Sequence, residues 1–446
     1  MIINLFLSIT LPAQVDEASI RQIFDRELHE GKAYEWLEEL ATTIGPRLSG
    51  SPGAKLAVEW GKRELERAAD SVWLQPVMVP QWVRGQKEIA RIKKSKSEIN
   101  ICALGGSVGT GPGGVTGELI EVKSLEELKL LGEKEIKGKI VFFNRPMDPG
   151  KIHTFAAYGG AVDQRGSGPS EAARFGAIGA IVRSMGLNQE DYPHTGGLRY
   201  DESLPKIPAV AISTKHADQL SKSLKADKHL QFYFETHCET LPDVQSFNVI
   251  GELKGSEYSD EIIVVSGHLD SWDLGQGAHD DGAGVVQAME VIRLFKVLGI
   301  KPKRTIRVVL FMNEENGLRG GMEYARHVEL KKEKHVAAIE SDRGGFTPRG
   351  FSMSCSANVR DRIKSWKPLL EPYGLTDFDQ EGGGADIGPL APFGVPLIGF
   401  LPDSQRYFDY HHTAADTIDK VSKRELELGA ASIAALVYLI DRHGLE

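Results

Sequence analysis

From about residue 245 onward, short apolar runs alternate with segments that have helical spacing. The runs occupy residues 262–265, 306–311, 336–339 and 395–400, and helices are expected over residues 283–298 and 425–440. Strands that alternate with helices form an open, mainly parallel sheet covered by helices on both faces. The predicted fold class is therefore α/β, and this architecture limits where polar side chains can gather.

Polar side chains follow three of the predicted strands, at the point where each strand ends. The first run leads into His268 and Asp270, the second into Glu314 and Glu315, and the third into Asp342. Because open α/β sheets bind ligands at the carboxyl ends of their strands, we expect these side chains to lie together. Crowded carboxylates repel one another, and a divalent cation removes that cost. The sequence therefore predicts a metal site at this edge.

Two further segments offer metal ligands. Asp280 lies in the turn HDDG at 279–282, and His411 and His412 lie in the segment DYHHT at 409–413. Taken alone, such segments are more often an acidic turn and a polar loop, but their combined order and spacing favour a metal site. The pattern does not choose between His411 and His412. Nitrogen and oxygen ligands suit zinc, cobalt or manganese, and zinc is usual where imidazole is present.

The ligand types suit two metal ions that share Asp280 and hold a water molecule between them. A base must take a proton from this water and pass it to the leaving amine. Glu314, which neighbours the predicted ligand Glu315, is the candidate base. Asp270 is expected to hold the second ring nitrogen of His268 and so fix its tautomer.

The chain divides into regions of different character. Residues 17–110 are expected to form the N-terminal part of the catalytic domain, and residues 245–446 complete that domain. Residues 111–244 contain short β-rich runs and are expected to form an insert. The glycine-rich stretch at 105–114 lacks the lysine of a phosphate-binding loop, so it is interpreted as a connection between domains.

The N-terminal segment and the net charge bear on location and partners. Residues 1–16 contain an apolar run that resembles a signal peptide, without its usual basic start, and an ordinary apolar segment is the alternative. Since no later segment is long enough to span a bilayer, a soluble secreted or periplasmic protein is expected. A net charge of -9 without a basic patch argues against nucleic-acid binding.

These motifs resemble those of the co-catalytic two-zinc exopeptidases, a family of aminopeptidases and glutamate carboxypeptidase-type enzymes. The most specific matches are SGHLDSWD at 266–273, GQG at 275–277 and DDG at 280–282. Further matches are TIGPRLSGS at 43–51, PHTG at 193–196, PKRT at 302–305 and GGGAD at 382–386. The resemblance extends over nearly the whole chain from about residue 30. It implies the zinc exopeptidase fold, with the insert as a protease-associated-like domain.

The resemblance also implies roles for individual residues and a homodimer. It makes Glu314 the general base and selects His412 over His411, because HTAADT at 412–417 fits the family pattern. A cis peptide bond is implied between Asp280 and Asp281. Asp280 would bridge two Zn²⁺ ions in each subunit. The remaining ligands would be His268 and Asp342 on one zinc, and Glu315 and His412 on the other.

The predicted activity is zinc-dependent hydrolysis of dipeptides or short unblocked peptides. The alternatives are an aminopeptidase that acts on longer peptides, a two-metal amidohydrolase that acts on non-peptide amides, and an inactive receptor-like protein. The complete set of predicted ligands argues against the last. Asp386 and Tyr410 are candidates for substrate contact. Residues 316–320 and 414–415 depart from the family pattern, which affects the substrate pocket rather than the ligands.

Overall fold

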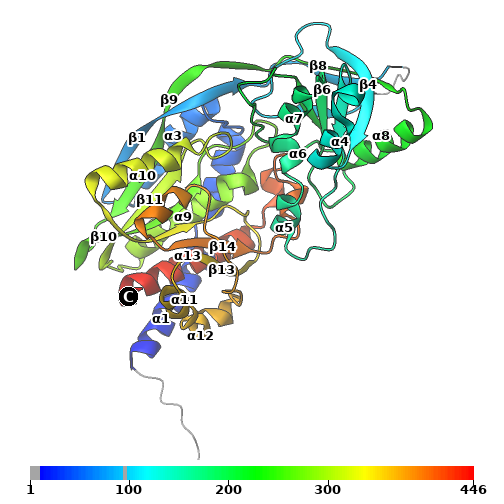
Figure 1. The fold of residues 1–446 in the computed structure, drawn as a ribbon. Helices are drawn as coiled ribbons and strands as arrows, with labels where there is room; N and C mark the ends of the chain where they lie inside the picture. Colours follow the sequence, from blue (N-terminus) through cyan, green and yellow to red (C-terminus); the bar gives the residue numbers. More distant parts are fainter. Residues whose placement is uncertain (1–10, 94–97, 446) are drawn as a thin grey trace, which may run out of the picture.

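The computed structural model describes residues 11–93 and 98–445, so residues 1–10 of the expected signal segment lie outside the described residues. The chain forms two lobes, and each is built on a seven-stranded sheet. In Figure 1 the larger, catalytic lobe lies below and to the left of the smaller lobe. Both sheets are mixed and carry helices, which confirms the predicted α/β class.

The sheet of the catalytic lobe is parallel in its centre and antiparallel at its edges. Its four central strands run parallel, whereas the edge strands pair antiparallel with their neighbours. The central strands are buried on both faces, as expected for continuous apolar runs. The strand order is β1 (Ser71–Val83), β9 (Glu239–Leu253), β11 (Arg304–Phe311), β10 (Tyr258–His268), β12 (Lys334–Glu340), β14 (Leu397–Pro402) and β13 (Pro348–Ser354).

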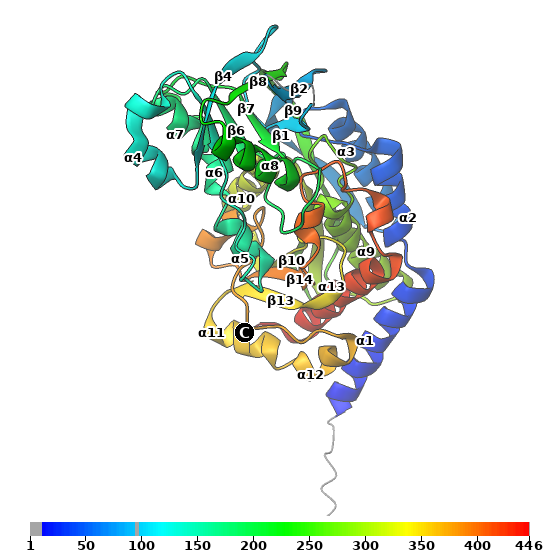
Figure 2. The same ribbon diagram turned by 90° about the vertical axis from the view of Figure 1, so that its right-hand side faces the viewer.

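Helices cover both faces of this sheet. The main core lies on one face, under α1 (Leu11–Glu30), α2 (Ala33–Glu38), the π-helix η1 (Glu39–Ile44), α3 (Pro52–Leu65), α9 (Ala283–Val297) and α13 (Lys423–His443). Figure 2 shows α1 lying along α13 on this face. The other face carries α10 (Arg319–Lys331) and η4 (Gly388–Phe393), while α11 (Ala357–Lys364), α12 (Lys367–Leu370) and η3 (Glu371–Tyr373) lie between β13 and β14 in the sequence.

The longest of these helices, α13, contains the helix predicted over residues 425–440 and extends it by two residues at its start and three at its end. The side chain of Ser422 accepts a hydrogen bond from the backbone N–H of Glu425 and caps the first turn. Gly444 follows the last turn with a positive φ of 67°, a conformation that favours glycine. The helix fixes the catalytic core without itself carrying a site residue.

The second lobe has its own sheet and its own core. The strand order is β2 (Glu88–Ile92), β8 (Gln231–Thr236), β4 (Val115–Val122), β5 (Ile140–Phe143), β6 (Gly179–Arg183), β7 (Ala209–Ile212) and β3 (Ile101–Ala103). Helices α4 (Leu125–Ile136) and α7 (Gly168–Arg174) pack on one face, and α8 (Thr214–Ala226) packs on the other. Strands β2 and β3 belong to this sheet because they pair with β8 and β7, although both precede residue 111, the expected start of the insert.

The two lobes meet along the chain segments that line the predicted site. Strands β1 and β9 pair over most of their length and join the lobes. Helix α5 (Thr154–Gly159) projects from the second lobe toward the catalytic lobe in Figure 1 and reaches the 3-10 turn η5 (Tyr407–Asp409), and α6 (Asp163–Gly166) follows it in the sequence. Apolar side chains of α5 pack there against Tyr407 and Phe408 in a small shared core. The insert therefore takes part in building the site.

Among residues 11–93 and 98–445, no helix combines the length with the apolar content that a bilayer span requires.

Candidate metal centre and active site

The predicted side chains converge at one edge of the central sheet. His268 ends β10, Glu314 and Glu315 follow β11, and Asp342 follows β12. Strands β11 and β12 each pair in parallel with β10, so their carboxyl ends lie together. Asp280 comes from the π-helical turn η2 (Ala278–Gly282), which leads directly into α9. The expected meeting of strand ends is therefore what the fold produces.

The carboxylate of Asp280 lies between two histidine rings. Its Oδ1 is 3.2 Å from Nε2 of His268, and its Oδ2 is 3.3 Å from Nε2 of His412. A second carboxylate lies near each of these histidines. Oδ1 of Asp342 is 3.4 Å from His268 Nε2, and Oε2 of Glu315 is 3.1 Å from His412 Nε2. Each histidine thus faces Asp280 and one further carboxylate.

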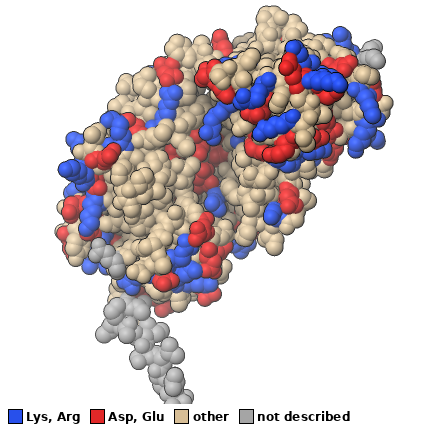
Figure 3. Space-filling model, in the orientation of Figure 1, with Lys and Arg blue, Asp and Glu red and all other residues tan. Residues whose placement is uncertain are grey.

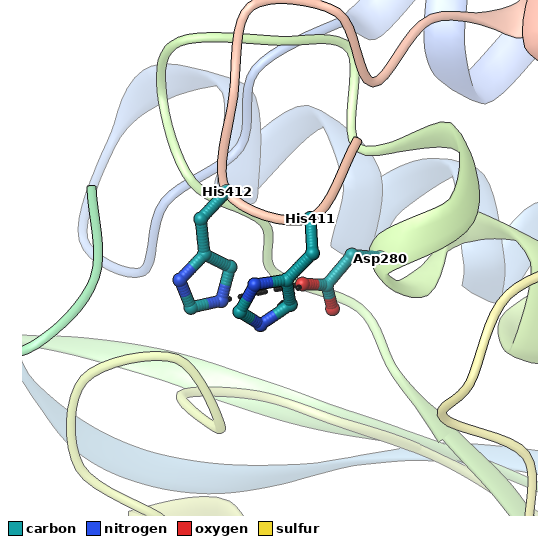
Figure 4. A group of neighbouring side chains, drawn as sticks. All are labelled: Asp280, His411 and His412. Atoms are coloured by element: carbon teal, nitrogen blue, oxygen red, sulfur yellow. Dashed lines mark ion pairs between the residues drawn. The ribbon is translucent and has the colours of Figure 1, made fainter. Parts of the chain in front are cut away.

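His411, which precedes His412 in the sequence, also approaches Asp280. Its Nε2 lies 3.7 Å from Asp280 Oδ2, and its ring stacks on that of His412 at a centroid distance of 3.5 Å. Figure 4 shows both rings beside the Asp280 carboxylate. Burial lowers the pKa of both histidines, which favours the neutral imidazole that binds metals. Only His412 also faces Glu315.

The donor set fits divalent cations. Nε2 of His268 and Oδ2 of Asp280 are buried and have no hydrogen-bond partner among the described residues. Burial raises the pKa values of Glu314 and Glu315 well above the usual value, and neighbouring carboxylates raise them further. A cluster of this kind is costly unless a cation compensates the charge. Three overlapping groups of ligand atoms in it are close enough to hold a metal ion.

Two acidic side chains, those of Asp281 and Asp416, hold the backbone around Asp280 by hydrogen bonds. The carboxylate of Asp281 accepts hydrogen bonds from the backbone N–H groups of His268 (2.9 Å) and Gly284 (3.0 Å). The carboxylate of Asp416 accepts from those of His279 (2.7 Å) and Asp280 (3.1 Å). The peptide bond between Asp280 and Asp281 is cis, as expected. Asp281 therefore fixes the backbone of the predicted ligand His268, and Asp416 fixes that of the predicted ligand Asp280.

Asp270 lies in a different position from the expected one. The backbone carbonyl of Asp270, rather than its carboxylate, lies at hydrogen-bond distance (3.0 Å) from Nδ1 of His268, and the carboxylate is 3.9 Å away. The carboxylate instead accepts from the backbone N–H groups of Asn313 (2.8 Å) and Glu314 (3.1 Å). Asp270 thus shapes the turn that presents Glu314.

Arg47 of the 43–51 motif holds the loop between His268 and Asp280. Its side chain is fully buried and donates to four carbonyls, those of Leu269 (2.7 Å), Gln276 (2.7 Å), Gly277 (2.8 Å) and Gly45 (3.4 Å). The motif was noticed in the sequence, but no role for Arg47 followed from it. Without this guanidinium, the carbonyls of Leu269 and Gln276 would lose their donor, whereas the Gly277 carbonyl would still accept from the N–H of Gly282.

We expect Arg47→Met to destabilise the protein and weaken metal binding. Each unpaired carbonyl costs about 1–3 kcal/mol, so the loss of donors at two carbonyls should lower the free energy of unfolding by at least about 2 kcal/mol. Urea denaturation with zinc titration measures both effects. Arg326→Met, which replaces an exposed arginine of α10, serves as a matched control that should remain within about 0.5 kcal/mol of the wild type. Equal stability of the two variants would refute the role given to Arg47.

A cavity of about 560 Å³ opens beside the metal cluster, within the range of small-ligand sites. Residues of both lobes line it, among them Glu314, Asp342 and His412 from the catalytic lobe and Tyr158 and Arg165 from the insert. Acidic side chains are visible in the hollow between the lobes in Figure 3. The cavity therefore gives a small ligand access to the cluster.

The two candidates for substrate contact lie away from the lining of this cavity. The ring of Tyr410 stacks on that of His279 at a centroid distance of 5.4 Å, whereas Tyr407 and Tyr158 line the cavity. Asp386 is 1% exposed, and its carboxylate oxygens have no hydrogen-bond partner among the described residues. Burial raises the pKa of Asp386 well above its usual value, and nearby carboxylates add to the shift.

The PHTG motif at 193–196 connects the insert to the metal cluster. The carbonyl of Thr195 lies 3.3 Å from Nδ1 of His412, and the Thr195 N–H donates to the His412 carbonyl at 3.0 Å. The first contact makes Nδ1 the proton-bearing nitrogen, so Nε2 is free to bind a metal. The motif is one of the further matches to the family pattern, and the sequence does not reveal that contact.

The fold and this cluster define a metal-dependent hydrolase of the zinc exopeptidase type. The sequence model of the protein family described as "Peptidase family M28" matches residues 248–437 of this chain. Carboxypeptidase Q of Bos taurus is 35% identical over 412 residues, which cover 92% of this chain and 85% of that protein. The chain belongs to peptidase family M28 and is a metallopeptidase, which confirms the family predicted from the motifs.

Solved structures agree with this assignment. The crystal structure of a peptidase M28 precursor from Shewanella amazonensis is similar, with a TM-score of 0.90 and 35% identity, and the match covers 96% of this chain and 97% of that one. A zinc aminopeptidase from Bacillus subtilis shares the fold, with a TM-score of 0.66 and 22% identity over 91% of this chain and 93% of that one.

Proposed function

We propose that this metalloexopeptidase holds two zinc ions and hydrolyses dipeptides or short unblocked peptides. The observation that carries the proposal is the Asp280 carboxylate, which presents one oxygen to His268 and the other to His412. Such an arrangement suits a carboxylate shared by two cations. Similarity to carboxypeptidase Q over 92% of the chain supports a peptide substrate.

The geometry suggests how the side chains would divide the work. His268, Asp280 and Asp342 would hold one zinc, and Asp280, Glu315 and His412 the other. When bound, the zinc ions supply Lewis acidity that polarises the scissile carbonyl and acidifies water. The backbone N–H of Trp272 donates to Oε1 of Glu315 at 3.1 Å, which leaves Oε2 directed at His412.

Glu314 is the proposed general base. It lines the cavity, whereas Glu315 is directed at His412. Its carboxylate makes no hydrogen bond within the part of the chain that the structure describes, so it is free to receive a proton. Glu314 would take a proton from the attacking water and deliver it to the amine that leaves. Asp270 would assist by holding the Glu314 backbone.

Two competing activities need separate tests. An aminopeptidase on longer peptides and an amidohydrolase on non-peptide amides would use the same metal pair. We would measure zinc per chain and the cleavage of free dipeptides, end-blocked dipeptides, longer peptides and N-acyl amino acids. The proposal expects two zinc ions per chain and the highest kcat/KM on free dipeptides. A chain that binds no zinc, or that prefers N-acyl amino acids, would refute it.

Export and dimer formation belong to the same proposal. The apolar pattern of residues 1–16 supports export, and the motif resemblance supports a homodimer. Light scattering coupled to size exclusion tests the dimer, for which a mass of about twice the 48.9 kDa chain is expected. A mass of one chain at micromolar concentration would count against it.

A further inference from the structure

A second cavity lies in the insert, apart from the metal cluster. Its volume is about 330 Å³, and none of the residues that line it borders the cavity beside the cluster. Figure 1 shows α8, which contributes to its wall, on the side of the smaller lobe that points away from the catalytic lobe. The lining includes four cations, Lys123, Arg183, Lys222 and Lys225, but a single carboxylate, that of Asp218. A hollow lined mainly by one sign of charge attracts ligands of the opposite sign.

The topology of the insert explains why these side chains gather. Strands β4, β5, β6 and β7 run parallel to one another, so their carboxyl ends share one edge of the second sheet. Lys123 and Asn144 directly follow β4 and β5, and Arg183 is the last residue of β6. Open α/β sheets bind ligands at this edge. The insert thus repeats the placement that brings the metal ligands together in the catalytic lobe.

Helix α8 supplies the remaining cations. It begins shortly after β7 ends, so its first turns lie near the same edge of the sheet. Asp218, Lys222 and Lys225 follow one another at helical intervals and therefore share one face of the helix, the face that lines the cavity. Leu220 and Leu224 of the same helix lie in the core of the insert. The sequence of α8 thus separates an apolar side from a side that carries charge.

Arg183 is the buried cation of this cavity, with 7% of the residue exposed. Its Nη1 donates to Oδ1 of Asp218 at 2.5 Å and to Oδ1 of Asn144 at 3.2 Å. Neither its Nη2 nor its buried Nε has a hydrogen-bond partner among residues 11–93 and 98–445. Because a guanidinium carries five N–H donors, the two protein acceptors leave most of them unused. An anion in the cavity would give Nη2 an acceptor.

The two lysines of α8 leave the cavity with an excess of positive charge. Neither Lys222 nor Lys225 forms a hydrogen bond or an ion pair within the part of the chain that the structure describes. The other two cations each pair with one carboxylate, as Lys123 does with Glu121. The four cations therefore exceed the neighbouring carboxylates by two charges.

The excess charge and the arrangement of the donors suit a phosphate group. A phosphate monoester carries about 1.5 to 2 negative charges at pH 7, and its acceptor oxygens point in different directions. The donors come from two strand ends and one helix, so they reach a ligand from several sides. Arginine and lysine are both common partners of phosphate. A volume of about 330 Å³ lies at the lower end of the range for small-ligand sites.

We propose that this cavity of the insert binds a phosphate group, either as the free ion or as a small monoester. Arg183, Lys222 and Lys225 would donate to its oxygens, while Asn144 would hold the Arg183 guanidinium in place. Asp218 would remain paired with Arg183. The inference goes beyond the proposed peptidase function and does not depend on it, because no residue of the metal cluster takes part.

Isothermal titration calorimetry on the zinc-loaded protein tests the proposal, at about 0.15 M ionic strength to screen non-specific attraction. The probes are inorganic phosphate and glycerol phosphate. A double variant with Lys222→Met and Lys225→Met should bind them at the insert at least about tenfold more weakly than the wild type, because it lacks two charge-assisted contacts. Phosphate bound at the zinc ions would appear in both proteins as the same additional site.

Further variants separate this site from a general effect of charge. Arg183→Gln should weaken the same site to a similar degree, whereas Lys215→Met, which changes an exposed lysine of α8 outside the cavity, should leave it unchanged. Because Lys222 and Lys225 are exposed, their double variant should fold normally even if Arg183→Gln is unstable. It should also keep its zinc content and its kcat/KM on a dipeptide.

The two probes distinguish the source of the phosphate group. Tighter binding of glycerol phosphate than of inorganic phosphate assigns the cavity to a monoester, and the reverse order assigns it to the free ion. A wild type that binds neither probe outside the metal centre would overturn the proposal, and so would a double variant in which no site is weakened. Succinate bound at the same site as tightly as phosphate would also overturn it, since the cavity would then recognise carboxylates.

Discussion

Glu314→Gln is expected to retain zinc and to lose roughly 10³-fold or more in kcat, because the amide cannot carry the proton from water to the leaving amine. The carboxylate lines the cavity. Its backbone is held by Asp270, which the substitution leaves in place. KM should change little, since the substitution keeps the size of the side chain and removes no proposed ligand.

Stopped-flow or steady-state hydrolysis of a free dipeptide, with zinc content measured on the same sample, provides the check. Glu329→Gln, an exposed Glu-to-Gln change on α10, is the matched control and should keep wild-type rates. Activity of Glu314→Gln within about tenfold of the wild type, with zinc fully bound, would remove Glu314 from its role as base.

Asp280→Ala is expected to lose zinc from both positions and to abolish hydrolysis. The two carboxylate oxygens face different histidines at 3.2 and 3.3 Å, so a single side chain serves both halves of the cluster. Its removal would leave each ion with only the ligands that are not shared. Zinc bound per chain should fall from two toward zero at micromolar free zinc.

Metal analysis by mass spectrometry after dialysis measures this loss. Asp361→Ala, an exposed aspartate of α11, is the matched control and should keep two zinc ions. Retention of two ions by Asp280→Ala would show that Asp280 is no bridge. Selective loss of one ion would assign Asp280 to a single position.

The convergence of the predicted ligands could be inferred from the sequence because strand ends are local features. An apolar run of strand length identifies β10, β11 and β12, and the residues directly after each run must then share an edge. This argument alone predicts that His268 and Asp342 lie at the same edge of the sheet. Whether His411, His412 or both bind metal did not follow, because adjacent residues of one loop have no period that fixes their directions.

Contacts between distant segments could not be inferred in this way. Arg47 holds a carbonyl 222 residues away, and Thr195 meets His412 across 217 residues. No local pattern encodes such partners, although the motifs around them were recognised. The antiparallel pairing of the edge strand β1 with β9 could not be predicted for the same reason, since it joins residues on either side of the insert.

Side-chain direction in short turns was also beyond the sequence. Tyr410 is one of the two predicted candidates for substrate contact, yet Tyr407 of the 3-10 turn η5 lines the cavity and the ring of Tyr410 stacks on His279. Asp270 shows a similar limit, because its backbone carbonyl takes the place expected for its carboxylate.

The central claim is that five side chains from separate parts of the chain meet around two zinc ions. Anomalous diffraction at the zinc edge, on crystals grown with zinc, tests it most directly. We expect two peaks that share Asp280, one also bound by His268 and Asp342 and the other by Glu315 and His412. A single peak, or a second ion held by His411 in place of His412, would contradict this assignment.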